Sequence, residues 1–138
     1  MTTTDSSLQC ALAAIDTANK ADPNQERVGD ELLPKEYAYS LHMTRWLFEL
    51  ESDPSERMQI ACRAQHIERW TMPRKDYPEG RKAYYQWRQA CGRMHGRRAA
   101  EIMAECGYPP VECERVETIL TKRELRQDED TQLLEDVA

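Results

Sequence analysis

Apolar side chains recur every three to four positions along most of this chain, which is the spacing of one face of an α-helix. The first such stretch covers about residues 8–20, with Leu8, Leu12 and Ile15 on its apolar face, and Pro23 prevents it from continuing. The same pattern predicts further helices over about residues 34–50, 54–70 and 81–106, a fifth that Pro109 and Pro110 open, and a sixth from near residue 129 to 138.

The segments between these helices carry the residues that stop helices. Residues 24–33 are polar and predict a loop, and residues 72–80 hold two prolines and a glycine, which predict an irregular segment. Gly107 is placed to end the fourth helix. Residues 1–7 are rich in Thr and Ser and predict a disordered tail. We therefore expect residues 8–138 to form a single all-α domain, a bundle of about six helices, with the third helix at its centre.

Composition narrows the class of protein. The 138 residues are 40% hydrophobic and 32% charged, which is typical of one globular domain. Only 5 are glycine, which argues against a Gly-rich nucleotide-binding sheet. No apolar run approaches the roughly 20 residues of a membrane span, and the first residues lack the pattern of a secretory signal. We expect a cytoplasmic protein that does not associate with membranes.

The cysteines predict free thiols. There are 5, an odd number, and no two form a C-x-x-C pair. A disulfide framework or a zinc ribbon is therefore not expected. Buried thiols in a reducing compartment explain the pattern.

Charge is distributed unevenly along the chain. Residues 63–98 contain ten basic and three acidic residues, although the whole chain has a net charge of -6. A basic segment in an acidic protein predicts a local site for an anion. The overall charge and the pI near 5.1 make nucleic acid an unexpected partner.

Two of the three histidines lie in this basic segment, and they are candidate metal ligands. His66 and His95 belong to different predicted helices, and Glu135 and Asp136 are adjacent acids within an apolar stretch of the last one. Helices that each project such a side chain into a bundle can hold a metal ion. The donor set predicts Fe, Mn or Zn, with His42 as a further candidate. Alternatively, the histidines are hydrogen-bonded core residues and the acids pair with arginines.

The irregular segment at 72–80 is surrounded by basic and aromatic residues. They are Arg69, Arg74, Arg81 and Arg88, with Trp70, Tyr77, Tyr84 and Trp87 between them. Guanidinium groups bind phosphate and also stack on aromatic rings. The cluster predicts a pocket for a phosphorylated or nucleotide-like small molecule. Alternatively, the arginines pair with acids elsewhere and the aromatic rings are core.

Trp87-Arg88 with His95, and three longer blocks of sequence, resemble a known family. The longer blocks are Ile15-Asp16-x-x-Asn19-x-x-Asp22-Pro23-Asn24, Gln65-His66-Ile67-x-Arg69-Trp70-x-x-Pro73-Arg74-x-x-Tyr77-Pro78, and Gln132-x-Leu134-Glu135-Asp136-Val137-Ala138. Together they resemble the family called domain of unknown function 4202, whose layout is similar to HD-type helical metal-dependent domains. The resemblance implies metal binding by His66 and Asp136, and places Lys122 where some such domains carry another histidine. The resemblance also implies that the chains of relatives continue beyond the position of residue 138. We therefore expect a homodimer or a protein partner to cover the last helix.

These observations lead to an expected function, which is metal-dependent hydrolysis of a phosphorylated small molecule or nucleotide. The expected roles are metal binding by His66, His95, Asp136 and Glu135, anion binding by Arg69, Arg74, Tyr77, Arg81, Trp87 and Arg88, and proton transfer by Lys122 or Glu68. Two alternatives remain open. One is a module that binds an anion or nucleotide without catalysis, and the other is a helical protein-interaction module.

Overall fold

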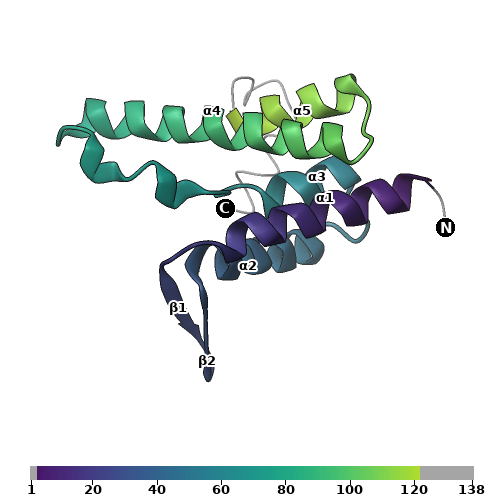
Figure 1. Ribbon diagram of the computed structural model, residues 1–138, viewed down its shortest axis with the longest axis horizontal. Coiled ribbons are helices and arrows are strands. Elements are labelled where there is room, and N and C mark those ends of the chain that lie inside the picture. The colour runs from purple at the N-terminus through teal and green to yellow at the C-terminus, as the bar shows by residue number, and fades with distance from the viewer. Residues whose placement is uncertain (1–2, 122–138) are drawn as a thin grey trace.

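The computed structural model describes residues 3–121, and over this range the chain is mainly α-helical (Figure 1). Its elements are α1 (Thr3–Lys20), β1 (Gln25–Val28), β2 (Glu31–Pro34), α2 (Lys35–Leu50), α3 (Glu56–Arg63), the 3-10 turns η1 (Arg69–Thr71) and η2 (Arg74–Asp76), α4 (Arg81–Glu105) and α5 (Pro110–Thr121). The expected all-α class is confirmed. The helix expected near residues 129–138 lies outside the described residues. Within residues 3–121, no helix combines the length and the apolar character needed to cross a membrane.

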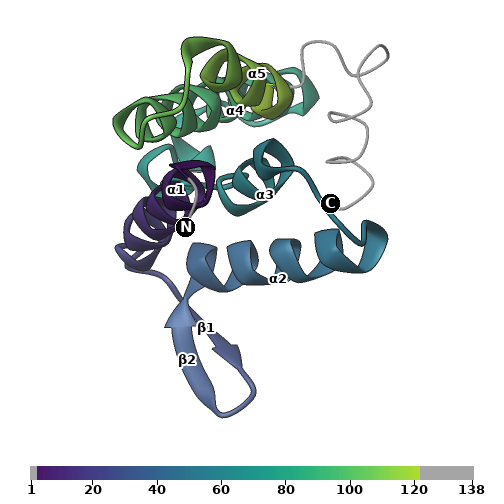
Figure 2. The same ribbon diagram turned by 90° about the vertical axis from the view of Figure 1, so that its right-hand side faces the viewer.

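The helix α3 lies at the centre of the packing, as its small side chains predict. It contacts α1, α2 and α5, while α4 and α5 pack along each other above it (Figure 2). All five α-helices within residues 3–121 and the turn after α3 contribute to the buried core: Ala11, Ile15, Met43, Leu47, Met58, Ile60, Ala61, Cys62, Ala64, Ile67, Ala99, Ile102, Met103, Cys113, Val116, Ile119 and Leu120.

Two glycines allow α4 and α5 to approach closely. A Cβ atom at Gly96 would lie 2.9 Å from the carbonyl oxygen of Glu117, and one at Gly92 would lie 3.3 Å from that of Leu120. The two glycines are one helical turn apart and so lie on the same face of α4. Because neither glycine has a side chain, the backbone of α5 packs directly against this face of α4.

Local signals define the start of α3 and the end of α4. The hydroxyl of Ser55 accepts a hydrogen bond from the backbone N–H of Met58 at 3.2 Å and so caps the start of α3. Gly107 adopts a φ of 94° just after α4, a conformation that favours glycine. The N–H of Tyr108 then donates to the carbonyl of Met103 at 3.0 Å, which closes the end of the helix.

The loop expected over residues 24–33 is instead a β-hairpin. Strands β1 and β2 pair antiparallel, with Val28 opposite Glu31. Gly29 and Asp30 form the two-residue turn, and Gly29 has a φ of 62°. This dipeptide is a hairpin signal. The flanking residues are mostly exposed, however, and polar and apolar side chains do not alternate along them as they do in a typical strand.

The third helix is shorter than expected. It ends at Arg63 instead of continuing to about residue 70, and the chain from residue 64 passes through turns into η1. Glu68 has a φ of 55°, which lies in the left-handed region and cannot continue an α-helix. Conversely, α1 is longer than expected, because it begins at Thr3 and so includes residues assigned to a disordered tail.

The prediction that all cysteines are free thiols is wrong. Cys10 of α1 and Cys106 at the end of α4 form a disulfide, at a separation of 96 positions in sequence. Only tertiary packing brings them together, so spacing in the sequence gives no sign of the pair. Cys62, Cys91 and Cys113 are buried and free, and burial raises the pKa of Cys62 to about 12. A reducing compartment was inferred from the absence of disulfides, and the Cys10–Cys106 bond removes that support.

Reduction of the disulfide should destabilise the protein. The bond closes a loop across 96 positions. Disulfides typically contribute about 2–4 kcal/mol to the free energy of unfolding, and those that close long loops contribute the most. Urea unfolding with and without reductant measures the loss, and the Cys10→Ser variant should show no effect of reductant. Alkylation of all five cysteines in the untreated, unfolded protein, detected by intact mass, would contradict the bond.

The Gly96→Ala variant should lower the free energy of unfolding by about 1–3 kcal/mol, because the new methyl group collides with the backbone of α5. Alanine is otherwise the better helix former, so the sign of the change is diagnostic. Urea unfolding measures it, with Gln89→Ala on the exposed face of α4 as the control. Stabilisation by Gly96→Ala would show that the two helices are not in such close contact.

Candidate functional site

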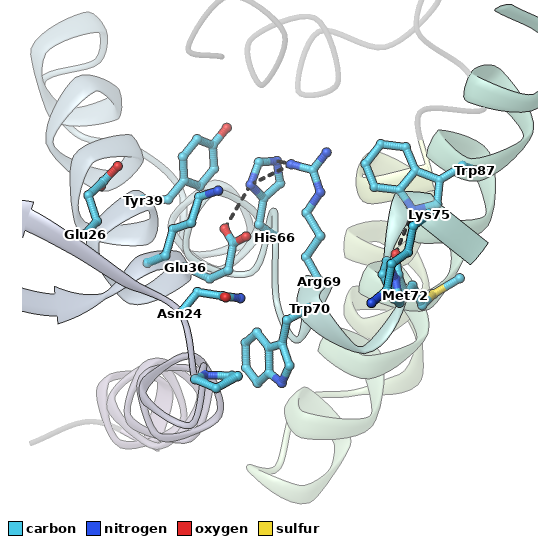
Figure 3. A pocket seen from close by; sticks show the side chains of 13 residues that line it. Asn24, Glu26, Glu36, Tyr39, His66, Arg69, Trp70, Met72, Lys75 and Trp87 are labelled. Carbon is cyan, nitrogen blue, oxygen red and sulfur yellow. Dashed lines mark hydrogen bonds and ion pairs between the residues drawn. The ribbon is translucent and has the colours of Figure 1, made fainter. Parts of the chain in front are cut away.

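A cleft of about 630 Å³ opens between the start of α2, the base of the hairpin and the segment that follows α3 (Figure 3). Its lining combines cations, acids and aromatic rings, and consists of Pro23, Asn24, Glu26, Lys35, Glu36, Tyr39, His66, Arg69, Trp70, Met72, Pro73, Lys75 and Trp87. Four of these residues, His66, Arg69, Trp70 and Trp87, are among those predicted from the sequence. The cleft therefore lies at the expected part of the chain but has a wider lining.

The side chains of Glu36 and His66 form a pair in this cleft. The Glu36 carboxylate lies 3.2 Å from Nδ1 of His66, and the two side chains are 10% and 22% exposed. The ring of Tyr39, one turn along α2 from Glu36, stacks on the imidazole with centroids 3.9 Å apart and planes 5° from parallel. The carboxylate and the tyrosine together fix the plane of the imidazole.

A second buried carboxylate, that of Asp22, holds the start of α2 in place. Its Oδ2 accepts a hydrogen bond from the backbone N–H of Glu36 at 2.9 Å. Its Oδ1 accepts from the backbone N–H of Asn24 at 2.9 Å and from Nδ2 of Asn24 at 3.0 Å. Asp22 is 3% exposed. A negative charge at the N-terminal end of a helix is electrostatically favourable, so Asp22 joins the end of α1 to the start of α2 and positions Glu36.

Helix α1 also fixes the end of α3, from which the chain continues to His66. The carboxylate of Asp16 pairs with the Arg63 guanidinium at 2.8 Å, and Nδ2 of Asn19 donates to the carbonyl of Arg63 at 3.3 Å. Nε of Arg63 also donates to the hydroxyl of Thr44 on α2 at 3.1 Å. Helices α1 and α2 thus hold the residue at which α3 ends.

The two histidines predicted to converge do lie together. The ring centroids of His66 and His95 are 6.1 Å apart, although the residues come from the turn after α3 and from α4. His95 is 4% exposed, and its Nδ1 lies 2.8 Å from the carbonyl oxygen of Ile67. Because a carbonyl only accepts, Nδ1 of His95 carries the proton. A carboxylate at Nδ1 of His66 favours the same tautomer, so both rings present Nε2 as the nitrogen with a lone pair.

Arg69 lies between the histidine and Trp87 (Figure 3). Its guanidinium nitrogen is 3.1 Å from Nε2 of His66, and its planar group lies over the Trp87 ring, 4.8 Å from the centroid. The indole N–H of Trp87 donates to the carbonyl of Met72 at 2.7 Å, which ties α4 to the segment below it. Arg69 is thus the one arginine of the predicted cluster that lines the cleft.

The other predicted anion-binding residues lie outside the cleft lining. Arg74 donates to the carbonyls of Tyr77 and Pro78, at 3.2 and 2.8 Å, and so stabilises the turn before α4. Arg81 and Arg88 are exposed on α4 and lie over tyrosine rings. These contacts place the three arginines on a neighbouring surface.

The acid predicted for proton transfer is engaged elsewhere. The carboxylate of Glu68 pairs with Arg98 of α4 at 3.0 Å, and Glu68 does not line the cleft.

Several predicted residues lie outside the described residues: Lys122, Glu135, Asp136 and the last helix with its expected homodimer or partner surface. Within residues 3–121, no group of three or more His, Cys, Asp and Glu side chains is arranged to hold a metal ion. The described part of the chain therefore supplies the two imidazoles but not a complete metal site.

Comparison with protein families matches residues 9–138 to the family described as Domain of unknown function (DUF4202). The chain belongs to this family. Comparisons with curated proteins and with solved structures give no match.

The sequence blocks that carry the family resemblance have clear tasks in this DUF4202 domain. The first block holds the end of α3 through Asp16 and Asn19, and the start of α2 through Asp22. The second block supplies His66 and Arg69 to the cleft. Glu36 was missed by sequence reasoning, because an acid in the first turn of a helix is commonly an exposed residue that stabilises the helix dipole. Only its burial beside His66 distinguishes it.

Removal of the Asp22 carboxylate should destabilise the protein and disturb the cleft. Asp22→Ala leaves three hydrogen-bond donors without their acceptor, and bonds to a charged group contribute about 1.5–3 kcal/mol each. We expect a loss of at least about 1.5 kcal/mol in urea unfolding. Asp53→Ala, at an exposed acid in the α2–α3 loop, is the matched control. Equal stability of the two variants would contradict this assignment.

Proposed function

We propose that this DUF4202 domain binds a phosphorylated, nucleotide-like small molecule in the cleft and hydrolyses it. The observation that carries the proposal is the convergence of a Glu36–His66 pair, a second imidazole and the Arg69 guanidinium in and beside the cleft. Acid, imidazole and guanidinium groups that meet in and beside a cleft are typical of sites that bind and transform anions.

The lining supports the binding half of the proposal. Lys35, Arg69 and Lys75 supply positive charge, and Trp70 and Trp87 supply ring surfaces in the same cleft. A guanidinium binds two phosphate oxygens at once, whereas ammonium groups act as point charges. An aromatic ring of the ligand would gain stacking energy against the tryptophans. Charge and aromatic surface in one cleft favour a ligand that has a phosphate and a ring.

The chemistry that the side chains would supply follows from which groups contact one another. Glu36 holds the proton on Nδ1 of His66, so Nε2 is the basic nitrogen and can take a proton from water. A phosphate that binds Arg69 would draw the guanidinium away from Nε2, which couples ligand binding to release of the base. Arg69 would then offset the negative charge that develops on the phosphate oxygens.

The imidazoles also fit part of a metal site. Each presents Nε2 while its Nδ1–H is held by another group, which is the usual arrangement of metal-binding histidines. We propose that His66 and His95 bind a divalent Fe, Mn or Zn ion, with Asp136 or Glu135 as the further ligand. Such an ion would lower the pKa of bound water toward neutrality. Arg69 and the ion would compete for Nε2 of His66, so a phosphate that recruits Arg69 would favour metal binding.

A non-catalytic anion-binding module is the second candidate. The close contact of Arg69 with His66 at 3.1 Å favours it, because a guanidinium at the imidazole repels a cation and attracts an anion. In this case the cleft would bind the same class of ligand and release it unchanged. Both candidates predict binding, and turnover separates them.

A thermal-shift screen of nucleoside phosphates and sugar phosphates tests the binding half. At least one of these compounds should raise the melting temperature of the full chain, and Arg69→Ala should abolish the shift because it removes the guanidinium of the cleft. Arg45→Ala, at an exposed arginine of α2 outside the cleft, should leave the shift unchanged. A screen without any stabilising compound would contradict both candidates.

Turnover is measured as release of inorganic phosphate from each compound that binds, with added Mn²⁺, Zn²⁺ or Fe²⁺ and with chelator. Hydrolysis that needs metal and is lost in His66→Ala and His95→Ala would support the hydrolase. The variants should still bind the ligand if Arg69 supplies most of the affinity. Binding without phosphate release under every metal condition would support the non-catalytic module instead.

A further inference from the structure

A second charged surface lies outside the cleft, on the first half of α4 and the segment before it. Figure 1 shows this half of α4 projecting beyond α1 and α5, with the chain that precedes it alongside. We define the arginine–tyrosine surface by five residues: Arg74, Arg81, Tyr84, Tyr85 and Arg88. The tyrosines are 40% and 48% exposed, so their rings are not part of the core.

The five side chains are arranged as ring faces with cations over them. The guanidinium groups of Arg74 and Arg88 each lie 5.9 Å from the centroid of Tyr84, and that of Arg81 lies 5.8 Å from the centroid of Tyr85. The two rings meet edge to face at 5.9 Å. Cation–π contacts at exposed sites contribute little to stability, so folding alone gives no strong reason to gather three arginines here.

The positive charge of this surface is not neutralised by the part of the chain that the structure describes. The ion pairs formed within residues 3–121 include none from Arg74, Arg81 or Arg88. Residues 69–93 hold seven basic and only two acidic residues, whereas the chain as a whole carries a charge of -6. Like charges held together on an acidic protein favour an anionic partner.

We propose that the arginine–tyrosine surface binds single-stranded nucleic acid, although the net charge of -6 for the whole chain argues against such a partner. Proteins that bind single strands combine positive charge for the phosphates with exposed aromatic rings on which bases stack. An acidic peptide would use the arginines but not the ring faces, and a duplex would offer phosphates but keep its bases paired. The observed combination of three unneutralised guanidinium groups and two exposed tyrosines therefore fits the single strand best.

The surface is distinct from the cleft but connected to it. None of its five residues lines the cleft, and Tyr84 lies 5.9 Å from Trp87, which does. A strand on this surface could therefore extend toward the cleft along the rings. The proposal does not depend on hydrolysis there, because variants of the surface leave the lining of the cleft unchanged.

Fluorescence anisotropy with a labelled 12-nucleotide single strand, of DNA and of RNA, tests the proposal on the full chain. Tyr84→Ala should raise Kd about fivefold or more, because stacking contributes about 1–3 kcal/mol per base, and Tyr84→Phe should retain the affinity. With three arginines at phosphates, the slope of log K against log salt should be near -2, since each phosphate contributes about 0.7. Arg88→Ala should make the slope about 0.7 shallower.

Controls separate this surface from general charge attraction. Arg45→Ala removes an exposed arginine of α2 that is not part of the surface, and it should not change Kd. Equal binding of a duplex of the same length, or displacement of the strand by poly-glutamate of equal charge, would overturn the proposal. So would the absence of binding at 50 mM salt, or equal Kd values for the wild type and Tyr84→Ala.

Discussion

Burial of carboxylates beside N–H groups is the constraint on which the cleft depends. Asp22 and Glu36 are both nearly inaccessible to water, and a buried carboxylate is costly unless hydrogen bonds replace its hydration. Asp22 meets that requirement with three donors, one of which is the backbone N–H of Glu36. Glu36 meets it with the imidazole of His66. The position of the histidine therefore depends on the geometry at the end of α1.

Local signals in the sequence were sufficient for most of the helices. The apolar periodicity predicted where α2, α4 and α5 lie, and Gly107 predicted where α4 ends. Where the structure departs from expectation, the cause is not local. The hairpin strands lack the alternation of polar and apolar residues that predicts a strand. Helix α3 ends before Glu68, whose φ is left-handed, and tertiary packing alone brings Cys10 and Cys106 close enough to form a disulfide.

The site shows the same division between local and tertiary information. Residue type and order were sufficient to select His66, His95 and Arg69, because imidazole and guanidinium groups are distinctive in a basic segment. The sequence could not show that Arg74, Arg81 and Arg88 lie on a different surface from Arg69, because all four surround one irregular segment. It also could not distinguish the buried Glu36 from the many acids that face water. That distinction depends on which helix ends meet in space.

The covalent link between Cys10 and Cys106 has a consequence for how the chain responds to damage. The hairpin and the segment before α4 both lie within the closed ring of polypeptide that this bond creates, and α5 lies beyond it. A backbone nick at the exposed tip of the hairpin would convert one chain into two pieces that stay attached through sulfur. The pieces could then separate only in surroundings that reduce the bond.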